Sequence, residues 1–347
     1  MKSIAESADT RVLIEAADAC AAAREGILEV PGQLQLHHGG SLEGVRLAWR
    51  LTGPAGAHVV AALGGISAHR VVYSEGQARH GWWDGLVGPG RALDASRFRI
   101  LGIDYLGGSG ATSGPRDGES FPSLSSYDQA ELLLRLVNHL GLTRLHAIVG
   151  ASYGGMVALA FAERFADRVE RLLVIGASDT THPMATAWRS VQRRLVRYAL
   201  THGEGARGLE LARALAMATY RSPEEFAARF RAAPEPTRDG FEFAVERYLF
   251  ARGADYANQY RAQSFLCLSE SIDLHSVDAT RIHVPVTVVG VREDQLVPLS
   301  DLRALCARLQ PHARLIEISS IYGHDAFLKE AGRLEPVFRN CLETAHE

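Results

Sequence analysis

The hydrophobic pattern of the chain begins, after residue 34, with short apolar runs of the kind that form strands. The first three are residues 45–51, 59–63 and 97–104, and each ends in glycine or polar turn residues. Further on, such runs alternate with segments whose apolar residues recur at helical spacing. In order, these segments predict a helix at 126–140, a strand at 146–150, a helix at 156–165 and strands at 171–175, 284–291 and 314–318.

Strands that alternate with helices predict an α/β fold built on a mostly parallel sheet. Parallel strands need crossover connections, so we expect the helices to cover both faces of that sheet. Residues 1–33 do not share this pattern, because they are rich in alanine and acidic groups and carry only a weak apolar stripe. We therefore set them apart as an N-terminal extension, with a helix expected over residues 10–24.

A second change of pattern occurs within residues 182–275. Apolar residues recur there at helical spacing over three stretches, at 188–198, 209–220 and 241–250. Ser222-Pro223-Glu224-Glu225 is a capping box with proline at the first helical position, so a further helix begins there. The predicted domains are the N-terminal extension 1–33, a core of residues 34–181 and 276–347, and an α-helical lid of residues 182–275 inserted into that core.

Composition narrows the class of protein. The 347 residues are 47% hydrophobic and 22% charged, which is typical of a globular protein with a large core. The net charge of −3 offers no field for nucleic acid or an anionic membrane. No uncharged apolar run reaches the roughly 18 residues of a membrane span, and charged residues interrupt the region where a signal peptide would lie. We expect a cytoplasmic protein that acts on small molecules.

The cysteine and histidine patterns point in the same direction. The four cysteines lie far apart, with no CxxC pair and no framework of the secreted kind, so we expect reduced thiols. No group of histidine, cysteine and carboxylate residues has metal-ligand spacing. Neither a metal nor a resident cofactor is therefore expected.

A candidate nucleophile is the serine of Gly150-Ala151-Ser152-Tyr153-Gly154, which matches G-x-S-x-G. A predicted strand precedes this segment and a predicted helix follows it. Small residues two positions before and after the serine permit the sharp turn that lifts its hydroxyl above a sheet. In that context we predict a nucleophile at Ser152.

A serine hydroxyl needs a base, and the base needs a carboxylate to hold its tautomer. Asp294 lies in an acidic loop after the strand at 284–291, and Glu293 beside it is the alternative. His324 lies in the loop after the strand at 314–318. The order Ser, Asp, His is the one expected when each follows a strand of such a sheet. We predict a triad of Ser152, Asp294 and His324.

Acyl transfer also needs backbone amides that stabilise an oxyanion. Tyr153, directly after the nucleophile, is one candidate donor. The strand at 59–63 ends in Gly64-Gly65-Ile66, which places a glycine turn where the second donor is needed. We name Gly65 as that donor, and Gly64 and Ile66 remain open as alternatives.

From about residue 34 to its end, the chain resembles the homoserine O-acyltransferases of methionine biosynthesis, a family with the α/β-hydrolase fold. Two stretches, Trp82-Trp83 and Tyr220-Arg221-Ser222, are not general hydrolase features and make the resemblance specific. The segments that carry it are residues 63–68, 81–90, 150–154, 218–222 and 323–327.

The resemblance implies the same triad and a ping-pong reaction through an acyl-serine. It further implies that Arg221 pairs with the carboxylate of the amino-acid substrate, which suits an arginine fork, and that Asp325 pairs with its ammonium group. A homodimer through the lid helices is a further implication. This chain has Leu63-Gly64-Gly65 where members that use acetyl-CoA commonly have Leu-Thr-Gly. The pocket for the amino acid can therefore differ, and L-serine remains an alternative to L-homoserine as the acceptor.

The acyl donor is inferred from position 189. Members that use acetyl-CoA tend to carry asparagine there, whereas succinyl-using members resemble this chain in carrying an arginine, Arg189. An arginine can pair with the free carboxylate of a succinyl group, and an acetyl group offers it nothing. We therefore predict succinyl-CoA as co-substrate, with homoserine O-acetyltransferase, serine O-acyltransferase and carboxylic ester hydrolase as alternatives.

Overall fold

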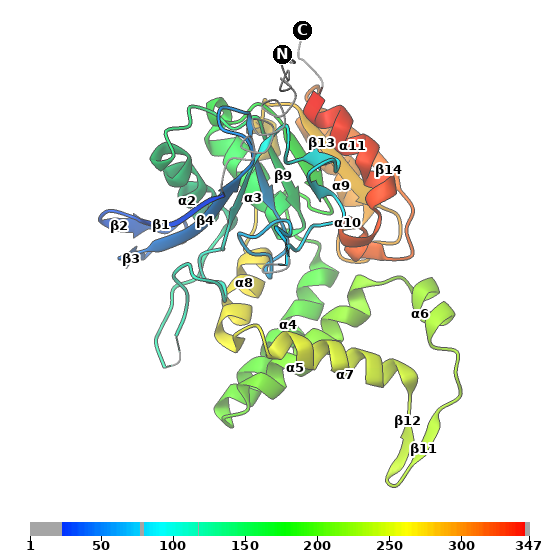
Figure 1. Ribbon diagram of the computed structural model, residues 1–347. Helices are drawn as coiled ribbons and strands as arrows, with labels where there is room; N and C mark the ends of the chain where they lie inside the picture. Colours follow the sequence, from blue (N-terminus) through cyan, green and yellow to red (C-terminus); the bar gives the residue numbers. More distant parts are fainter. Residues whose placement is uncertain (1–22, 77–79, 117, 344–347) are drawn as a thin grey trace, which may run out of the picture.

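In the computed structural model, which describes residues 23–76, 80–116 and 118–343, a single large sheet forms the centre of the molecule (Figure 1). It has eight strands in the order β1-β4-β8-β5-β9-β10-β13-β14. Strand β4 pairs antiparallel with β1 and β8, and all other neighbours are parallel. The prediction of a mostly parallel α/β sheet is confirmed. The strands are β1 (Arg24–Glu29), β4 (Arg46–Thr52), β5 (Val59–Leu63), β8 (Arg99–Ile103), β9 (Ala147–Ala151), β10 (Leu172–Ile175), β13 (Val286–Val291) and β14 (Ala313–Ile318).

Helices cover both faces of this sheet. Alternate residues of β5 point to opposite sides, so that Ala61 and Leu63 join one core while Val60 and Ala62 join the other. The first core is closed by α2 (Ser126–His139), α3 (Tyr153–Arg164) and α9 (Leu299–Leu309), and the second by α11 (Ala331–Glu343). Shorter elements are the strand pairs β2 (Gln33–Gln35) with β3 (Ser41–Glu43) and β6 (Val87–Gly88) with β7 (Leu93–Asp94), helix α10 (Ala326–Lys329), and the 3-10 turns η1 (Ala166–Arg168), η2 (Ala279–Arg281) and η3 (Gly323–Asp325).

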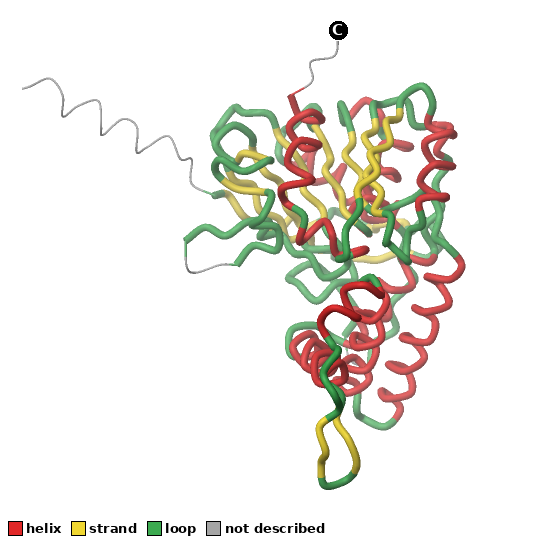
Figure 2. The backbone as a smooth tube through the Cα atoms, turned by 90° about the vertical axis from the view of Figure 1, so that its right-hand side faces the viewer, coloured by secondary structure: helices red, strands yellow, loops and turns green. Residues whose placement is uncertain are grey.

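Between β10 and β13 the chain leaves the sheet and forms a helical insertion, residues 183–273, which lies below the ends of the strands (Figure 1). Its helices pack around a small core of their own, which includes Val196, Leu209 and Phe265. A hairpin projects from the insertion away from the sheet (Figure 2). The elements are α4 (Pro183–Thr201), α5 (Gly205–Tyr220), α6 (Pro223–Arg229), the hairpin strands β11 (Glu235–Thr237) and β12 (Gly240–Glu242), α7 (Ala244–Ala257) and α8 (Ala262–Asp273).

The N-terminal boundary predicted at residue 33 is wrong. Strand β1 pairs with β4 along its whole length, from Arg24 opposite Leu51 to Glu29 opposite Arg46, so the sheet already begins at residue 24. An edge strand gains main-chain hydrogen bonds from one neighbour and needs little apolar signal of its own, and β1 contains Gly26 and an exposed Ile27. The helix expected over residues 10–24 falls outside the described residues except for its last two positions, and Arg24 is extended.

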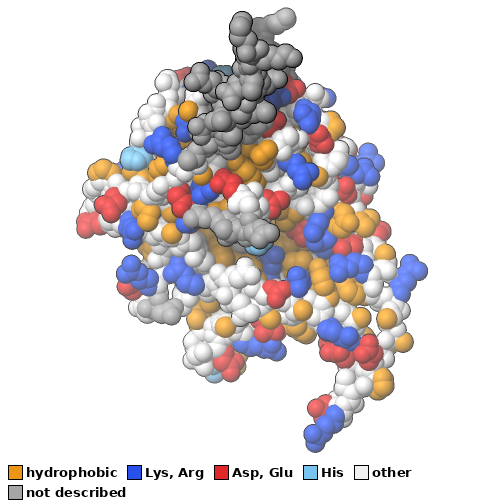
Figure 3. All heavy atoms as spheres, in the orientation of Figure 1, with side chains coloured by type: hydrophobic (Ala, Val, Ile, Leu, Met, Phe, Trp, Pro, Cys, Tyr) orange, Lys and Arg blue, Asp and Glu red, His pale blue; other side chains and the backbone are white. Residues whose placement is uncertain are grey.

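No helix within the described part of the chain has both the length and the apolar character needed to cross a membrane. On the face shown in Figure 3, basic and acidic side chains are interspersed and do not form a field of one sign. The charge pattern read from the composition therefore holds for this face of the folded molecule.

Candidate active site

Ser152 stands on a strained turn between β9 and α3. Among the residues that the structure describes, it is the one non-glycine residue with a positive φ, at 53°. Such a backbone costs about 1–3 kcal/mol and persists only where its surroundings enforce it. The flanking glycines leave no room for a side chain, because a Cβ on Gly150 would lie 2.3 Å from the Gly154 oxygen, and one on Gly154 would lie 2.2 Å from the Leu63 oxygen. The turn therefore requires the G-x-S-x-G spacing.

Two loops at the same end of the sheet bring a histidine and a carboxylate to this serine. The His324 Nε2 lies 2.9 Å from the Ser152 Oγ, and its Nδ1 lies 2.7 Å from the Asp294 Oδ2. The other carboxylate oxygen of Asp294 accepts hydrogen bonds from the amides of Leu296 and Val297 at 2.8 and 3.1 Å. Asp294 is thus oriented by its own loop, and it in turn orients His324.

The electrostatics of the histidine follow from its burial and its partner. Burial lowers the pKa of His324, but the charge of Asp294 and the hydrogen bond to it outweigh burial and raise that pKa above its ordinary value. Glu293, the alternative carboxylate, instead binds Ser319 and the amide of Ser320. The geometry therefore pairs Asp294, and not Glu293, with His324. Such a chain of hydrogen bonds can take the proton from Ser152 and return it.

Both predicted sources of oxyanion donors lie next to Ser152. Tyr153 is the first residue of α3, and the first amides of a helix have no partner within it. Gly65 and Ile66 line the same cavity as Ser152, whereas Gly64 does not. The choice among the three loop residues therefore narrows to Gly65 and Ile66.

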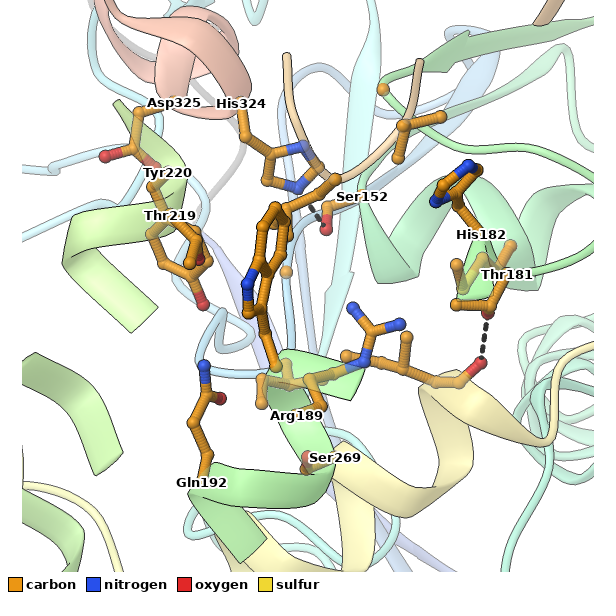
Figure 4. Close-up of a pocket in the computed structure, with 18 of the residues that line it drawn as sticks. Ser152, Thr181, His182, Arg189, Gln192, Thr219, Tyr220, Ser269, His324 and Asp325 are labelled. Carbon is orange, nitrogen blue, oxygen red and sulfur yellow. Dashed lines mark hydrogen bonds between the residues drawn. The ribbon is translucent and has the colours of Figure 1, made fainter. Parts of the chain in front are cut away.

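The cavity around Ser152 lies between the sheet and the helical insertion (Figure 4). The core contributes Ser152, His324 and the loops that hold them. The insertion closes the opposite side with residues of α4, α5 and α8. The residues of these three helices that line the cavity are Trp188, Arg189, Gln192, Arg213, Thr219, Tyr220, Phe265, Ser269 and Ile272.

The side chain of Arg189 extends from α4 into this cavity and points toward Ser152, as Figure 4 shows. Its Nε donates a hydrogen bond of 2.8 Å to the Asp273 Oδ1. Its Nη2 lies 2.7 Å from the same oxygen, so Asp273 holds the guanidinium on its Nε and Nη2 side. The guanidinium is therefore positioned by Asp273 while the Arg189 side chain lines the cavity.

Arg221 is placed differently from the prediction. Its Nε donates to the Asp325 Oδ2 at 2.9 Å, and its Nη1 donates to both oxygens of Glu225 at 3.1 Å. It is buried, and it does not belong to the cavity wall, whereas Asp325 does. Two carboxylates already balance its charge, so the structure does not support a direct pairing of Arg221 with a substrate carboxylate.

Besides Arg189, a second arginine lines the cavity, Arg213, which was not predicted from the sequence. It lies on α5, seven residues before Tyr220, and its guanidinium sits over the rings of Tyr220 at 5.2 Å and Tyr256 at 4.7 Å. Burial lowers the pKa of Arg213, but the neighbouring Tyr220, Tyr256 and Asp325 outweigh it and raise that pKa. The available signal was the spacing, since residues seven apart share one face of a helix.

Comparison with known proteins agrees with this geometry. Residues 71–331 match the model of the alpha/beta hydrolase fold family. The chain is 42% identical to a homoserine O-succinyltransferase of Xanthomonas campestris pv. campestris, over 98% of this chain and 89% of that protein. It is 35% identical to a homoserine O-acetyltransferase of Thermus thermophilus, over 75% of this chain and 71% of the relative. A serine O-succinyltransferase of Litchfieldella anticariensis is 32% identical, with 91% and 97% covered.

Solved structures share the fold at lower identity. A homoserine O-acetyltransferase from Bacillus anthracis superposes with a TM-score of 0.84 at 19% identity, covering 94% of this chain and 98% of that one. Esterase E22 superposes with a TM-score of 0.83 at 19% identity, covering 93% and 100%. The same architecture thus carries both acyl transfer and ester hydrolysis, so the side chains in the cavity must decide the reaction.

Proposed function

Because the chain belongs to the homoserine O-acyltransferase family of α/β hydrolases, we propose that it moves a succinyl group from succinyl-CoA to the hydroxyl of L-homoserine, in methionine biosynthesis. The observation that carries the proposal is the guanidinium of Arg189, which Asp273 holds in place while the side chain lines the cavity together with Ser152. A succinyl group ends in a carboxylate that can pair with this guanidinium through charge-assisted hydrogen bonds. The 42% identity to a homoserine O-succinyltransferase supports the same donor.

In the first half-reaction, His324 takes the proton of Ser152 as the serine oxygen bonds to the thioester carbon. The negative charge on the carbonyl oxygen is stabilised by the amides of Tyr153 and Gly65. The carbon–sulfur bond then breaks, and CoA leaves as a thiol with the proton from His324. The product of this step is a succinyl ester on Ser152.

In the second half-reaction, His324 takes the proton of the homoserine hydroxyl, and that oxygen attacks the ester carbon. The bond to Ser152 breaks, His324 returns the proton to the serine, and O-succinylhomoserine leaves. Arg213 holds the carboxylate of homoserine and Asp325 its ammonium group, because both line the cavity beside His324. In this scheme Arg221 orients Asp325 through their 2.9 Å contact.

The helical insertion acts as the lid of this site. An acyl-serine open to bulk water would hydrolyse before the acceptor arrived, so water must be kept out. Apolar parts of the cavity wall are supplied by Trp188, Phe265 and Leu296. No resident cofactor or metal takes part in the scheme, since the acyl-CoA is a co-substrate.

We further propose a homodimer and a cytoplasmic site of action. Met184, Val191 and Tyr198 lie seven residues apart along α4 and are 52%, 53% and 67% exposed, an apolar stripe that a second copy would cover. A reducing compartment suits the free thiols of Cys267 and Cys306. Sedimentation velocity of the native chain and of Val191→Glu tests the dimer: a native monomer, or a variant that still dimerises, would contradict this surface.

The experiment that tests the function measures CoA release with a thiol reagent. Succinyl-CoA and acetyl-CoA are each paired with L-homoserine and with L-serine, and p-nitrophenyl esters are offered without an acceptor. We expect the fastest turnover with succinyl-CoA and L-homoserine. Faster turnover with acetyl-CoA would make the chain an acetyltransferase, preference for L-serine would change the acceptor, and turnover of p-nitrophenyl esters alone would favour the esterase.

A further inference from the structure

The loop that follows β5 is held at two of its carbonyl oxygens by tyrosine hydroxyls from distant parts of the chain. Tyr105, which comes after β8 in the core, donates a hydrogen bond of 2.8 Å to the oxygen of Gly64. Tyr260, which lies between α7 and α8 of the helical insertion, donates one of 2.6 Å to the oxygen of Ile66. One tyrosine hydroxyl therefore holds the Gly64–Gly65 peptide unit, and the other holds the Ile66–Ser67 peptide unit.

The bond at Gly64 determines where the amide of Gly65 points. A peptide unit is planar and trans, so the oxygen of Gly64 and the N–H of Gly65 belong to one rigid plane and face opposite ways. The Gly64 oxygen accepts a second hydrogen bond, of 2.9 Å, from the amide of Gly154. Two donors thus hold that oxygen toward the core, and the Gly65 N–H faces the other side, where Gly65 lines the cavity with Ser152.

The surroundings leave the loop no easy alternative position. A Cβ on Gly64 would lie 2.7 Å from the Ala68 Cβ and 2.8 Å from the Trp82 ring, so the backbone is tightly enclosed. Burial raises the pKa of both Tyr105 and Tyr260 far above the ordinary value, so both hydroxyls stay protonated and act as donors. The ring of Tyr105 also packs edge-on against Tyr153 at 5.1 Å.

We propose that Tyr105 and Tyr260 are positioning residues that aim the Gly65 N–H at the oxyanion formed on the acyl group at Ser152. The inference rests on the proposed nucleophilic role of Ser152. Tyr105 fixes the loop from the core, and Tyr260 fixes it from the insertion, so the oxyanion site is complete only with the insertion seated. Tyr256 stacks on Tyr260 with 4.9 Å between the ring centroids, and the guanidinium of Arg213 lies over the Tyr256 ring. These contacts connect Arg213, the proposed partner of the homoserine carboxylate, to the loop after β5.

The test replaces each hydroxyl by hydrogen, in Tyr105→Phe, Tyr260→Phe and the double variant. Loss of a whole oxyanion donor costs about 100- to 1000-fold in kcat. Because these variants loosen the Gly65 amide without removing it, we expect kcat to fall about 10-fold in each and further in the double variant. KM for the acyl-CoA and for L-homoserine should stay within about twofold, since the interaction is made in the transition state.

Tyr127→Phe is the matched control. Tyr127 is a buried tyrosine whose hydroxyl binds Glu163, and it lies outside the cavity. The Tyr127→Phe variant should lose about as much stability as the Tyr105→Phe and Tyr260→Phe variants, and it should keep the kcat of the native protein. If Tyr105→Phe and Tyr260→Phe keep the kcat of the control, or lose kcat only in proportion to folded protein in thermal melts, the inference is overturned.

A second measurement separates this inference from the proposed function. Phosphonylation of Ser152 by a fluorophosphonate also develops negative charge on an oxygen in the same site and needs no acyl-CoA. We expect its rate to fall about 10-fold in both tyrosine variants and to stay unchanged in Tyr127→Phe. If the native protein uses neither succinyl-CoA nor acetyl-CoA, and the fluorophosphonate labels the tyrosine variants more slowly than the native protein, the proposed function fails and the positioning role stands. Unchanged labelling with an active native acyltransferase would leave the function intact and refute the positioning role.

Discussion

Replacement of Arg189 by asparagine is the change that tests donor recognition most directly. The Arg189 side chain is 11% exposed, lines the cavity, and is held by Asp273 through Nε and Nη2. Asp273 also pairs with Arg193 at 2.5 Å, so the variant does not leave a buried carboxylate without a partner. The loss should therefore be confined to the contact with the donor.

The magnitude follows from the kind of interaction lost. A hydrogen bond to a charged group contributes about 1.5–3 kcal/mol. Because both partners of this pair are charged, we take the upper part of that range, about 2–3 kcal/mol, for the pair with a succinyl carboxylate. At 1.36 kcal/mol for each factor of ten, kcat/KM for succinyl-CoA should fall roughly 30- to 160-fold. For acetyl-CoA, which has no carboxylate, kcat/KM should change less than about threefold.

The assay is CoA release at subsaturating donor with saturating L-homoserine. Arg189→Lys keeps the charge but loses the planar fork, so it should fall between the native chain and Arg189→Asn. Arg197→Asn is the matched control, because Arg197 lies on the same helix, is 54% exposed and faces Glu270 at 3.9 Å. Equal losses for the two donors in Arg189→Asn, or no loss with succinyl-CoA, would refute the proposed role.

Three further changes test other parts of the site. Arg213→Lys should raise KM for L-homoserine at least about 10-fold, because a bidentate partner of the carboxylate is lost. Arg221→Lys should raise this KM less. If steady-state assays give the reverse order, Arg221 and not Arg213 binds the substrate carboxylate. Because Asp294 raises the pKa of His324, and the base must be neutral, kcat/KM should rise with pH through a value above the ordinary histidine pKa. In Asp294→Asn that acid limb should move to lower pH with a much lower kcat, and an unmoved limb in the pH–rate profile would contradict the coupling. Gly154→Ala should lower the melting temperature markedly, since its Cβ would lie 2.2 Å from the Leu63 oxygen; a native-like thermal melt would contradict the steric argument.

Much of this molecule was predictable from local sequence pattern. Apolar runs and helical spacing are set by residues a few positions apart, so the strands of the large sheet after β1 and the sheet type follow from the chain itself. The turn at Ser152 is also local, because its glycines lie two positions away on either side. The placement of Asp294 and His324 needed one more rule, that loops after parallel strands meet at one edge of the sheet.

The edge strand and the position of Arg213 in the cavity wall were not predictable in this way. β1 is a strand because β4 offers it a ladder of main-chain hydrogen bonds, and its own residues carry little apolar alternation. Arg213 lies within α5, and Arg221 is the extended residue that ends it, with φ −105° and ψ 156°, so the two side chains leave in different directions.

The sequence by itself therefore determined the strands of the large sheet after β1, the sheet type, the nucleophile turn and the identity of its partners in chain order, because each depends on neighbours or on a general rule of connection. Only the tertiary structure decided that Arg213 and not Arg221 lines the cavity, that Arg189 is held by Asp273, and that Tyr105 and Tyr260 bind the carbonyl oxygens of Gly64 and Ile66. The physical reason is distance along the chain. Tyr260 and Ile66 are separated by 194 positions, and only the packing of the insertion on the core brings that hydroxyl to that carbonyl.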